Sequence, residues 1–274
     1  MLLTPERTCP QARTRRFLMV PPTEFTVNYE INPWMDKRKP VDTERAMAQW
    51  EALVAAYREH GHDVRLLEGM PGLPDMVFSA NGGLSVDGIF YTALFTHPQR
   101  VAEAVWHAAW HQTHGSRVVQ ATQINEGEGD FAVVGERILA GHGFRTSLAA
   151  HAELADVTGR EVVSLRLVNP SFYHLDTALT VLDETTVAYY PGAFDADSQE
   201  TLARLYPTAI RVAEADAHHF ALNSLSDGLH VFCAADAAGF IDQLAERGYA
   251  PVPLDLSEFR LAGGGIKCCT QELR

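Results

Sequence analysis

Segments with strand and helix patterns alternate along the whole chain of 274 residues, with frequent turn signals and no long linker. Apolar residues at three- and four-residue spacing predict a helix over 43–60, which Gly61 ends. Further helices are expected over 98–112, 147–158, 198–206 and 236–246. Short strands are expected at 16–20, 63–67, 76–79, 84–86, 89–92, 117–124, 131–134, 137–140, 161–167, 179–182, 186–190, 209–212 and 251–254. This order predicts one α/β domain over residues 1–274, built from similar ββαβ-like units.

The composition excludes several classes of protein. Apolar residues make up 46% and charged residues 21%, so a disordered or fibrous chain is not expected. A net charge of −13 disfavours a nucleic-acid partner, because such a surface repels phosphates. No apolar run is long enough to predict a membrane span. Four cysteines without a C-x-x-C pair favour neither a disulfide scaffold nor a zinc site, and a cytoplasmic location is expected.

The clearest chemical signal lies near the C-terminus, where Gly263, Gly264 and Gly265 precede Cys268 and Cys269. Consecutive glycines are used where a chain passes close to something or takes unusual dihedrals. A cysteine three residues later is a candidate nucleophile. On an extended backbone the two cysteines would point to opposite faces, so only one could act. The alternative is a glycine loop before a buried strand.

Two further segments carry acid–base residues. His174 and Asp176 are two positions apart, so an extended backbone would place imidazole and carboxylate on one face, unless they are simply a surface pair. Glu126, Glu128 and Asp130 alternate with glycines, and an extended backbone would crowd their carboxylates. Burial would then require a cation, either a guanidinium or a divalent metal, whereas an exposed turn would not.

The polar residues of the N-terminal third have simpler alternative roles. Asn81 stands before two glycines and could be a turn residue, and Asp75 lies on the other side of the short apolar segment. Residues 28–34 are polar and aromatic and end near a proline, which suits a binding loop or an irregular connection.

In chain order these segments resemble the guanidino-group-modifying (pentein, or amidinotransferase) superfamily. Within it the likeness is to dimethylarginine dimethylaminohydrolases, arginine deiminases and arginine dihydrolases. The resemblance is carried by residues 27–35, 73–78, 126–130, 143–146, 174–176 and 263–268, which span nearly the whole chain. It implies a five-bladed α/β propeller of ββαβ-like units around a central pocket.

The resemblance also implies roles for residues at matching positions. Cys268 would be the nucleophile and His174 the general acid and base. Asp176 and Asp75 would contact the guanidinium, and Arg145 the substrate α-carboxylate. The acidic turn has one residue more than the family's Glu-Gly-Gly-Asp, so the catalytic acid is either Glu126 or Glu128. We favour Glu126 as the catalytic acid, and Glu128 would then contact substrate. Asn32 and Asn81 resemble the arginine dihydrolases.

The implied reaction is hydrolysis of a guanidino C–N bond through a covalent cysteine S-alkylthiouronium, without metal or organic cofactor. Arginine would give citrulline and ammonia, and a methylated arginine would give citrulline and an amine. The alternatives are a second hydrolysis to ornithine, transfer of the amidino group, a non-catalytic arginine-binding module and a metal hydrolase that uses the acidic turn. The expected partner is a small guanidino amino acid, with no nucleic acid or membrane, and a homo-oligomer is compatible with the sequence.

Overall fold

The structure, a computed structural model, describes residues 10–274 and contains five three-stranded sheets. Four sheets use consecutive strands: β3 (Gly83–Val86), β4 (Ile89–Thr92) and β5 (Arg117–Val119); β6 (Phe131–Val134), β7 (Arg137–His142) and β8 (Glu161–Arg166); β9 (Leu179–Val181), β10 (Val187–Tyr189) and β11 (Ile210–Arg211); β12 (Leu225–Ser226), β13 (His230–Ala234) and β14 (Ala250–Leu254). The fifth joins β15 (Gln271–Glu272), β1 (Arg16–Met19) and β2 (Asp63–Leu66). The predicted order of short strands is therefore largely confirmed.

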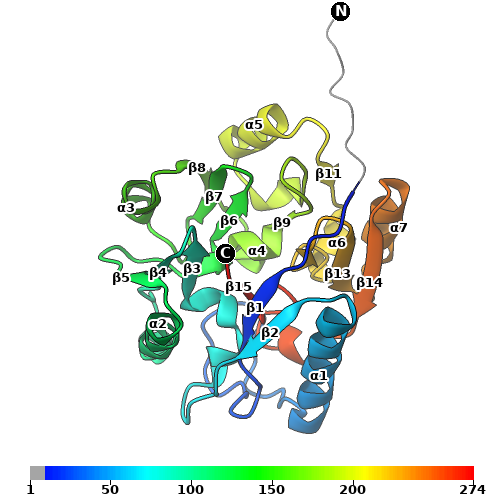
Figure 1. Ribbon diagram of the computed structural model, residues 1–274. Helices are drawn as coiled ribbons and strands as arrows, with labels where there is room; N and C mark the ends of the chain where they lie inside the picture. The colour runs from blue at the N-terminus through cyan, green and yellow to red at the C-terminus, as the bar shows by residue number, and fades with distance from the viewer. Residues whose placement is uncertain (1–9) are drawn as a thin grey trace, which may run out of the picture.

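Each sheet repeats one pattern of pairing. Its central strand has an antiparallel partner on one side and a parallel partner on the other. A helix connects each parallel pair, as parallel strands require. These helices are α1 (Thr43–Glu59), α2 (Glu103–Thr113), α3 (Leu148–Thr158), α5 (Ala196–Leu205) and α7 (Ala238–Glu246). In Figure 1 the five sheets surround the middle of the molecule, where β15 lies, and these helices lie toward the outside.

The local sequence explains where α1 and α3 begin and where α3 ends. Asp42 caps α1 by accepting the backbone N–H of Arg45, and Ser147 caps α3 by accepting that of Ala150. Gly159 ends α3 in the left-handed conformation at φ 70°. The buried face of α1 includes Trp50, Leu53, Val54 and Tyr57, as the apolar spacing predicts.

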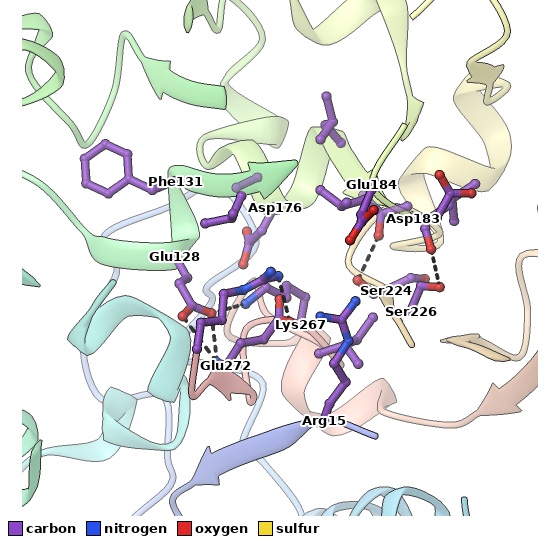
Figure 2. Close-up of a pocket in the computed structure, with 18 of the residues that line it drawn as sticks. Arg15, Glu128, Phe131, Asp176, Asp183, Glu184, Ser224, Ser226, Lys267 and Glu272 are labelled. Atoms are coloured by element: carbon purple, nitrogen blue, oxygen red, sulfur yellow. Dashed lines mark hydrogen bonds and ion pairs between the residues drawn. The ribbon is translucent and has the colours of Figure 1, made fainter. Parts of the chain in front are cut away.

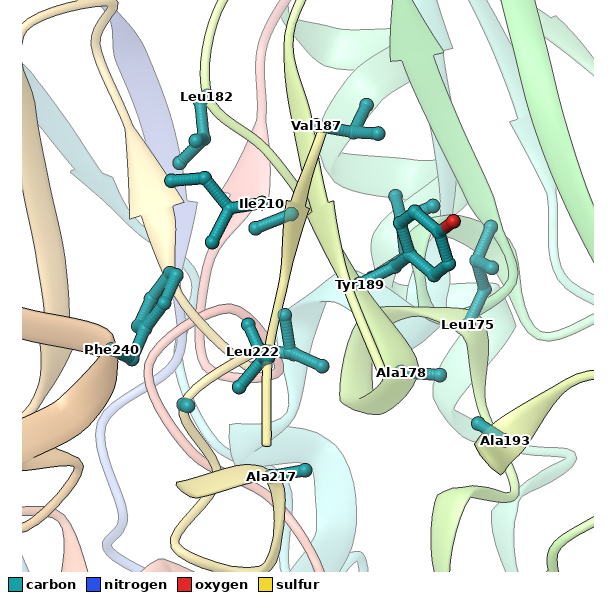
Figure 3. Close-up of a cluster of buried hydrophobic side chains, with 14 of the residues drawn as sticks. Leu175, Ala178, Leu182, Val187, Tyr189, Ala193, Ile210, Ala217, Leu222 and Phe240 are labelled. Atoms are coloured by element: carbon teal, nitrogen blue, oxygen red, sulfur yellow. The ribbon is translucent and has the colours of Figure 1, made fainter. Parts of the chain in front are cut away.

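The largest hydrophobic cluster fixes the segment that carries two of the candidate site residues. Leu175 and Ala178 belong to the short helix α4 (Leu175–Ala178) and pack in the cluster with Tyr189, Leu222 and Phe240 (Figure 3). Since His174 directly precedes this helix and Asp176 lies within it, core packing holds both residues in place.

Three sequence expectations about local structure are wrong. Residues 76–79 form no strand but lie in two short 3₁₀ helices, Pro74–Val77 and Ser79–Gly82. Their backbone is bonded locally and to a distant segment, since Phe78 N–H donates to Asp75 O and Ala80 N–H to Cys268 O. The strand expected over 117–124 stops at Val119, and the helix over 98–112 is divided into a 3₁₀ turn, Pro98–Arg100, and α2.

Within residues 10–274 we find no helix with the length and apolar character needed to cross a bilayer.

Candidate active site

Cys268 lies in a buried turn between the three glycines and β15. Its Sγ is 3.2 Å from Asp176 Oδ2 and accepts a hydrogen bond of 3.0 Å from Asn223 Nδ2. The backbone here is a turn rather than an extended strand, because Cys269 N–H donates to Gly265 O and Thr270 N–H to Lys267 O. Cys269 is also buried and belongs to the same hydrophobic cluster as Cys268, but the sulfur that contacts the Asp176 carboxylate is that of Cys268.

The glycines before Cys268 are explained by close approach. A Cβ on Gly264 would lie 2.2 Å from the Phe78 ring, and one on Gly265 would lie 2.9 Å from Asn223 Oδ1. Gly263 has φ +83°, which disfavours other residues. The predicted close passage of the chain is therefore confirmed.

The backbone at His174 and Asp176 is not an extended strand, so the two side chains do not share one strand face. His174 has extended dihedrals and caps α4, whereas Asp176 is inside that helix. The two side chains therefore meet different partners: His174 Nε2 is 2.8 Å from Glu126 Oε2, and Asp176 is beside Cys268. Their Cα atoms are still within about 7–8 Å of each other, because only two peptide units separate them.

The acidic turn is also not extended but a 3₁₀ helix over Gly127–Gly129. Its carboxylates consequently point to separate partners. Glu126 contacts Arg145 Nη1 at 2.8 Å as well as His174, and Glu128 Oε2 accepts from Lys267 Nζ at 2.6 Å. Asp130 accepts from the Thr146 hydroxyl and the Leu175 N–H. Residues 10–274 contain no group of three or more acidic, His or Cys side chains placed to hold a metal ion.

Tyr173 connects the cysteine and histidine halves of the site. Its ring centre is 4.7 Å from that of His174, and Arg145 Cζ lies 4.6 Å from it on the ring face. Its hydroxyl donates to Gly263 O at 2.8 Å, at the start of the segment that leads to Cys268. Burial raises the pKa of Tyr173 well above its usual value, although the charge of Arg145 opposes the shift.

Asp75 and Asn81 are held at the same site by a buried arginine. Arg100 donates from Nη1 to Asn81 Oδ1 at 2.9 Å and from Nη2 to Asp75 O at 3.1 Å. Glu103 pairs with the same guanidinium at 2.8 Å. The Asn81 amide is 3.4 Å from Glu126 O, so Asn81 is more than an isolated turn residue.

The segment around Asn32 covers the site from another side. Asn32 Nδ2 donates to Ala262 O at 3.0 Å and lies 3.3 Å from the Tyr173 hydroxyl. Trp34 Nε1 donates to Ser171 O, and Arg145 Nη2 donates to Ile31 O. The predicted binding loop therefore touches the residues that flank the site.

Burial and charge give the acids of the site different protonation tendencies. Burial raises the pKa of Asp176 to about 7, against the opposing effect of Lys267, and raises that of the Cys268 thiol well above its usual value. Burial alone would also raise the pKa of Glu126, but Arg145 and His174 hold it well below its ordinary value. Glu126 is thus a fixed carboxylate, whereas Asp176 can exchange a proton near neutrality.

Three carboxylate oxygens of the site, Asp75 Oδ1, Glu126 Oε1 and Asp176 Oδ1, have no hydrogen-bond partner within residues 10–274. Leaving such groups buried and unpaired is unfavourable. A planar guanidinium supplies several N–H donors that match carboxylate oxygens, so these acids suit a guanidino ligand.

Beyond Asp176 a cavity of about 110 Å³ extends toward Arg15, Ser224 and Glu184. Figure 2 shows Glu128, Lys267 and Glu272 together at its edge, next to Asp176. Glu128 and Asp176 therefore both line this cavity.

Four residues at the site were not predicted from the sequence: Asn223, Tyr173, Arg100 and Glu103. Asn223 and Tyr173 reach the site through contacts 45 and 90 residues apart, which no local pattern reveals. Tyr173 had one available signal, its position next to His174.

Fold and site together define a mixed α/β protein with a buried cysteine, histidine and carboxylate site suited to a cation. A family model described as eukaryotic N,N dimethylarginine dimethylhydrolase matches residues 18–274. The chain belongs to this family.

Relatives and solved structures agree with that membership. The chain is 52% identical over 270 residues to N(G),N(G)-dimethylarginine dimethylaminohydrolase of Mycobacterium tuberculosis, covering 98% of this chain and 89% of that protein. It also matches the crystal structure of the N-terminal domain of ArgZ bound to product, an arginine dihydrolase of cyanobacteria, at TM-score 0.92, 35% identity and coverage of 96% and 98%. A second structure of that domain, covalently bound to a reaction intermediate, matches at TM-score 0.90 and 35% identity, with coverage of 95% and 98%.

Proposed function

We propose that this protein is an amidine hydrolase that cleaves a guanidino C–N bond of arginine or an Nω-methylated arginine, giving citrulline and ammonia or an amine. The proposal is supported by two buried pairs, Cys268 with Asp176 and His174 with Glu126. Tyr173 lies between them, because its ring packs on His174 and its hydroxyl donates to Gly263 O. The 52% identity to a dimethylarginine dimethylaminohydrolase supports the methylated substrate.

In the proposed reaction, the guanidinium is held by Asp75 and Asp176, whose free oxygens can accept its N–H groups. The incoming positive charge favours transfer of the Cys268 proton to His174, and the resulting thiolate adds to the guanidino carbon. His174, oriented by Glu126, protonates the departing nitrogen, and the carbon remains bound to sulfur as an S-alkylthiouronium. His174 then accepts a proton from water that attacks the carbon, and the thiol is released with citrulline. The covalent intermediate in the ArgZ domain supports such a scheme.

We assign the acid of the turn to Glu126 because it contacts His174, whereas both oxygens of Glu128 contact Lys267 or the Glu272 N–H. Binding of substrate by Glu128 stays a prediction. Arg145 is proposed to hold the α-carboxylate, and this would replace its contact with Glu126 or with Ile31 O. We also propose that Asn32 and Asn81 contact substrate.

We infer that the five sheets are the blades of a five-bladed α/β propeller whose central pocket is this site, and that residues 1–274 act as one catalytic domain. The repeated strand pairing supports the first inference, and closure of the β1 sheet by β15 supports the second.

A second candidate function is arginine dihydrolysis to ornithine, ammonia and carbon dioxide. It is supported by the TM-score of 0.92 to the ArgZ domain and by Asn32 and Asn81 at the site.

Product analysis separates the candidates. The purified chain is incubated with arginine and, separately, with Nω,Nω-dimethylarginine, and citrulline, ornithine and amines are quantified. Citrulline from either substrate is expected, and Cys268→Ser serves as the inactive control. Ornithine as the main product would favour the dihydrolase, and no turnover of either compound would contradict the proposal.

A further inference from the structure

Asn223 makes an unusual set of contacts with the candidate nucleophile. Its Nδ2 donates to Cys268 Sγ at 3.0 Å and to Asp176 O at 3.1 Å, and its Oδ1 accepts the Cys268 N–H at 3.1 Å. The side chain is buried, with 1% of its surface exposed. One amide therefore binds the sulfur and the backbone of the same cysteine.

These contacts require an amide in a fixed orientation. Because Oδ1 is engaged by the Cys268 N–H, Nδ2 must face the sulfur and Asp176. Gly265 leaves room for this arrangement, since a Cβ there would lie 2.9 Å from Oδ1. The Asn223 N–H bonds to Phe220 O and its carbonyl accepts the Lys267 N–H, so the backbone is also held on both sides.

The charge around the sulfur explains why a donor is needed. Asp176 lies 3.2 Å from the sulfur, and a carboxylate there opposes formation of a thiolate. Cys269 and Tyr173 are further ionisable groups that interact with Cys268. Lys267 offsets Asp176 from a greater distance, but its Nζ is engaged by Glu128 and by Thr270 O. The Asn223 N–H thus faces the sulfur directly, where a hydrogen bond to a charged acceptor is strongest.

We propose that Asn223 is a positioning residue that aims the Cys268 sulfur at the guanidino carbon and stabilises its negative charge during attack. This inference rests on the proposed function, because Asn223 has a catalytic role only if Cys268 is the nucleophile. Its effect on the sulfur can be measured without substrate.

The test compares Asn223→Asp, Asn223→Ala and Ser224→Ala in the full chain. Asn223→Asp keeps the size of the side chain and the acceptor for the Cys268 N–H, but replaces the donor by an oxygen. Ser224→Ala is the matched control, because this buried neighbour donates to Ala221 O and does not contact Cys268. For each variant, the alkylation rate of Cys268 by iodoacetamide is followed against pH by mass spectrometry, and kcat and KM are measured. Thermal unfolding shows that each variant is folded.

Without the donor, the alkylation midpoint in Asn223→Ala should move up by about one pH unit and kcat should fall about ten- to hundredfold, while KM changes less than about threefold. Asn223→Asp should shift the midpoint further, because it adds negative charge. Ser224→Ala should keep the parent midpoint. The proposal is overturned if folded Asn223→Asp keeps the parent midpoint, or if Ser224→Ala shifts it equally. If the parent turns over neither substrate, the proposed function fails, and the alkylation profile still decides the role of Asn223.

Discussion

Glu126 directly precedes the 3₁₀ helix Gly127–Gly129 and Glu128 lies within it, yet the two side chains contact different partners. Glu126 contacts His174 and Arg145, and its pKa is held low by those neighbours against the effect of burial. Burial raises the pKa of Glu128 to about 7, although Lys267 opposes the shift, and its partners join the acidic turn to the C-terminal segment. Both carboxylates are buried and both have a cation beside them, so the difference in pKa comes from the several cations around Glu126 and from the neighbouring acid Glu272 beside Glu128.

The largest expected difference is between Glu126→Gln and Glu128→Gln. Loss of the Glu126 charge removes the partner of His174, so kcat should fall by about 10²–10⁴-fold. Glu128→Gln should instead lower the free energy of unfolding by roughly 1–3 kcal/mol, because buried Lys267 loses its carboxylate. Steady-state kinetics and denaturant unfolding of both variants measure this contrast. Equal losses of kcat would show that Glu128 also acts in the reaction.

The next prediction concerns pH and the protonation of Asp176. Burial raises its pKa in the folded state to about 7 from an ordinary value of 3.8, so folding takes up a proton between these values. Its contribution to stability is therefore complete below about pH 4 and is lost as pH rises to 7. In Asp176→Asn the fall in unfolding free energy between pH 4 and 7 should be shallower. An unchanged slope would mean that Asp176 is ionised throughout.

Substrate binding should have the opposite pH dependence at the same residue. A guanidinium is held by the ionised carboxylate, so apparent affinity should increase as pH rises through about 7. Calorimetric titration of the Cys268→Ser variant with arginine measures this, and affinity independent of pH from 6 to 8 would exclude Asp176 as the controlling group.

The smallest expected effect is a change in stability at the turn between Glu126 and Glu128. Gly127 has φ +55°, and a Cβ there would lie 2.6 Å from the Gly83 backbone. Gly127→Ala should cost about 1–3 kcal/mol of stability. Gly61→Ala is the control, since Gly61 has φ +81° but nothing within 4 Å of a Cβ. If both variants lose the same stability, contact with Gly83 contributes nothing.

Much of the fold could be predicted because each strand or helix carries a local apolar pattern, as in α1 and in the hairpin of β3 and β4. Predictions of secondary structure were wrong where contacts between distant segments determine the backbone conformation. Residues 74–82 form 3₁₀ turns because they bond to one another and to Cys268 O. The acidic segment forms a 3₁₀ helix, and its contacts also come from distant positions, since that of Glu126 with Arg145 spans 19 residues.

Candidate site residues could be proposed from residue chemistry and family resemblance, but their contacts could not. Glu126 and Glu128 were alternatives for the catalytic acid in the sequence, and only their contacts with His174 and Lys267 favour one over the other. Asn223 lies in an ordinary-looking segment, Ala221-Leu222-Asn223-Ser224, so no motif marks it.

The central claim is that Cys268 becomes covalently bound to the guanidino carbon. It is tested most directly by acid-quenching the protein during turnover of arginine or dimethylarginine and measuring the mass of the peptide that contains Cys268, with Cys269→Ser as the control that keeps the reactive thiol. We expect a substrate-derived adduct on Cys268 in the parent protein and in Cys269→Ser, and no turnover by Cys268→Ser. Absence of any adduct on Cys268, together with activity that survives Cys268→Ser, would contradict it.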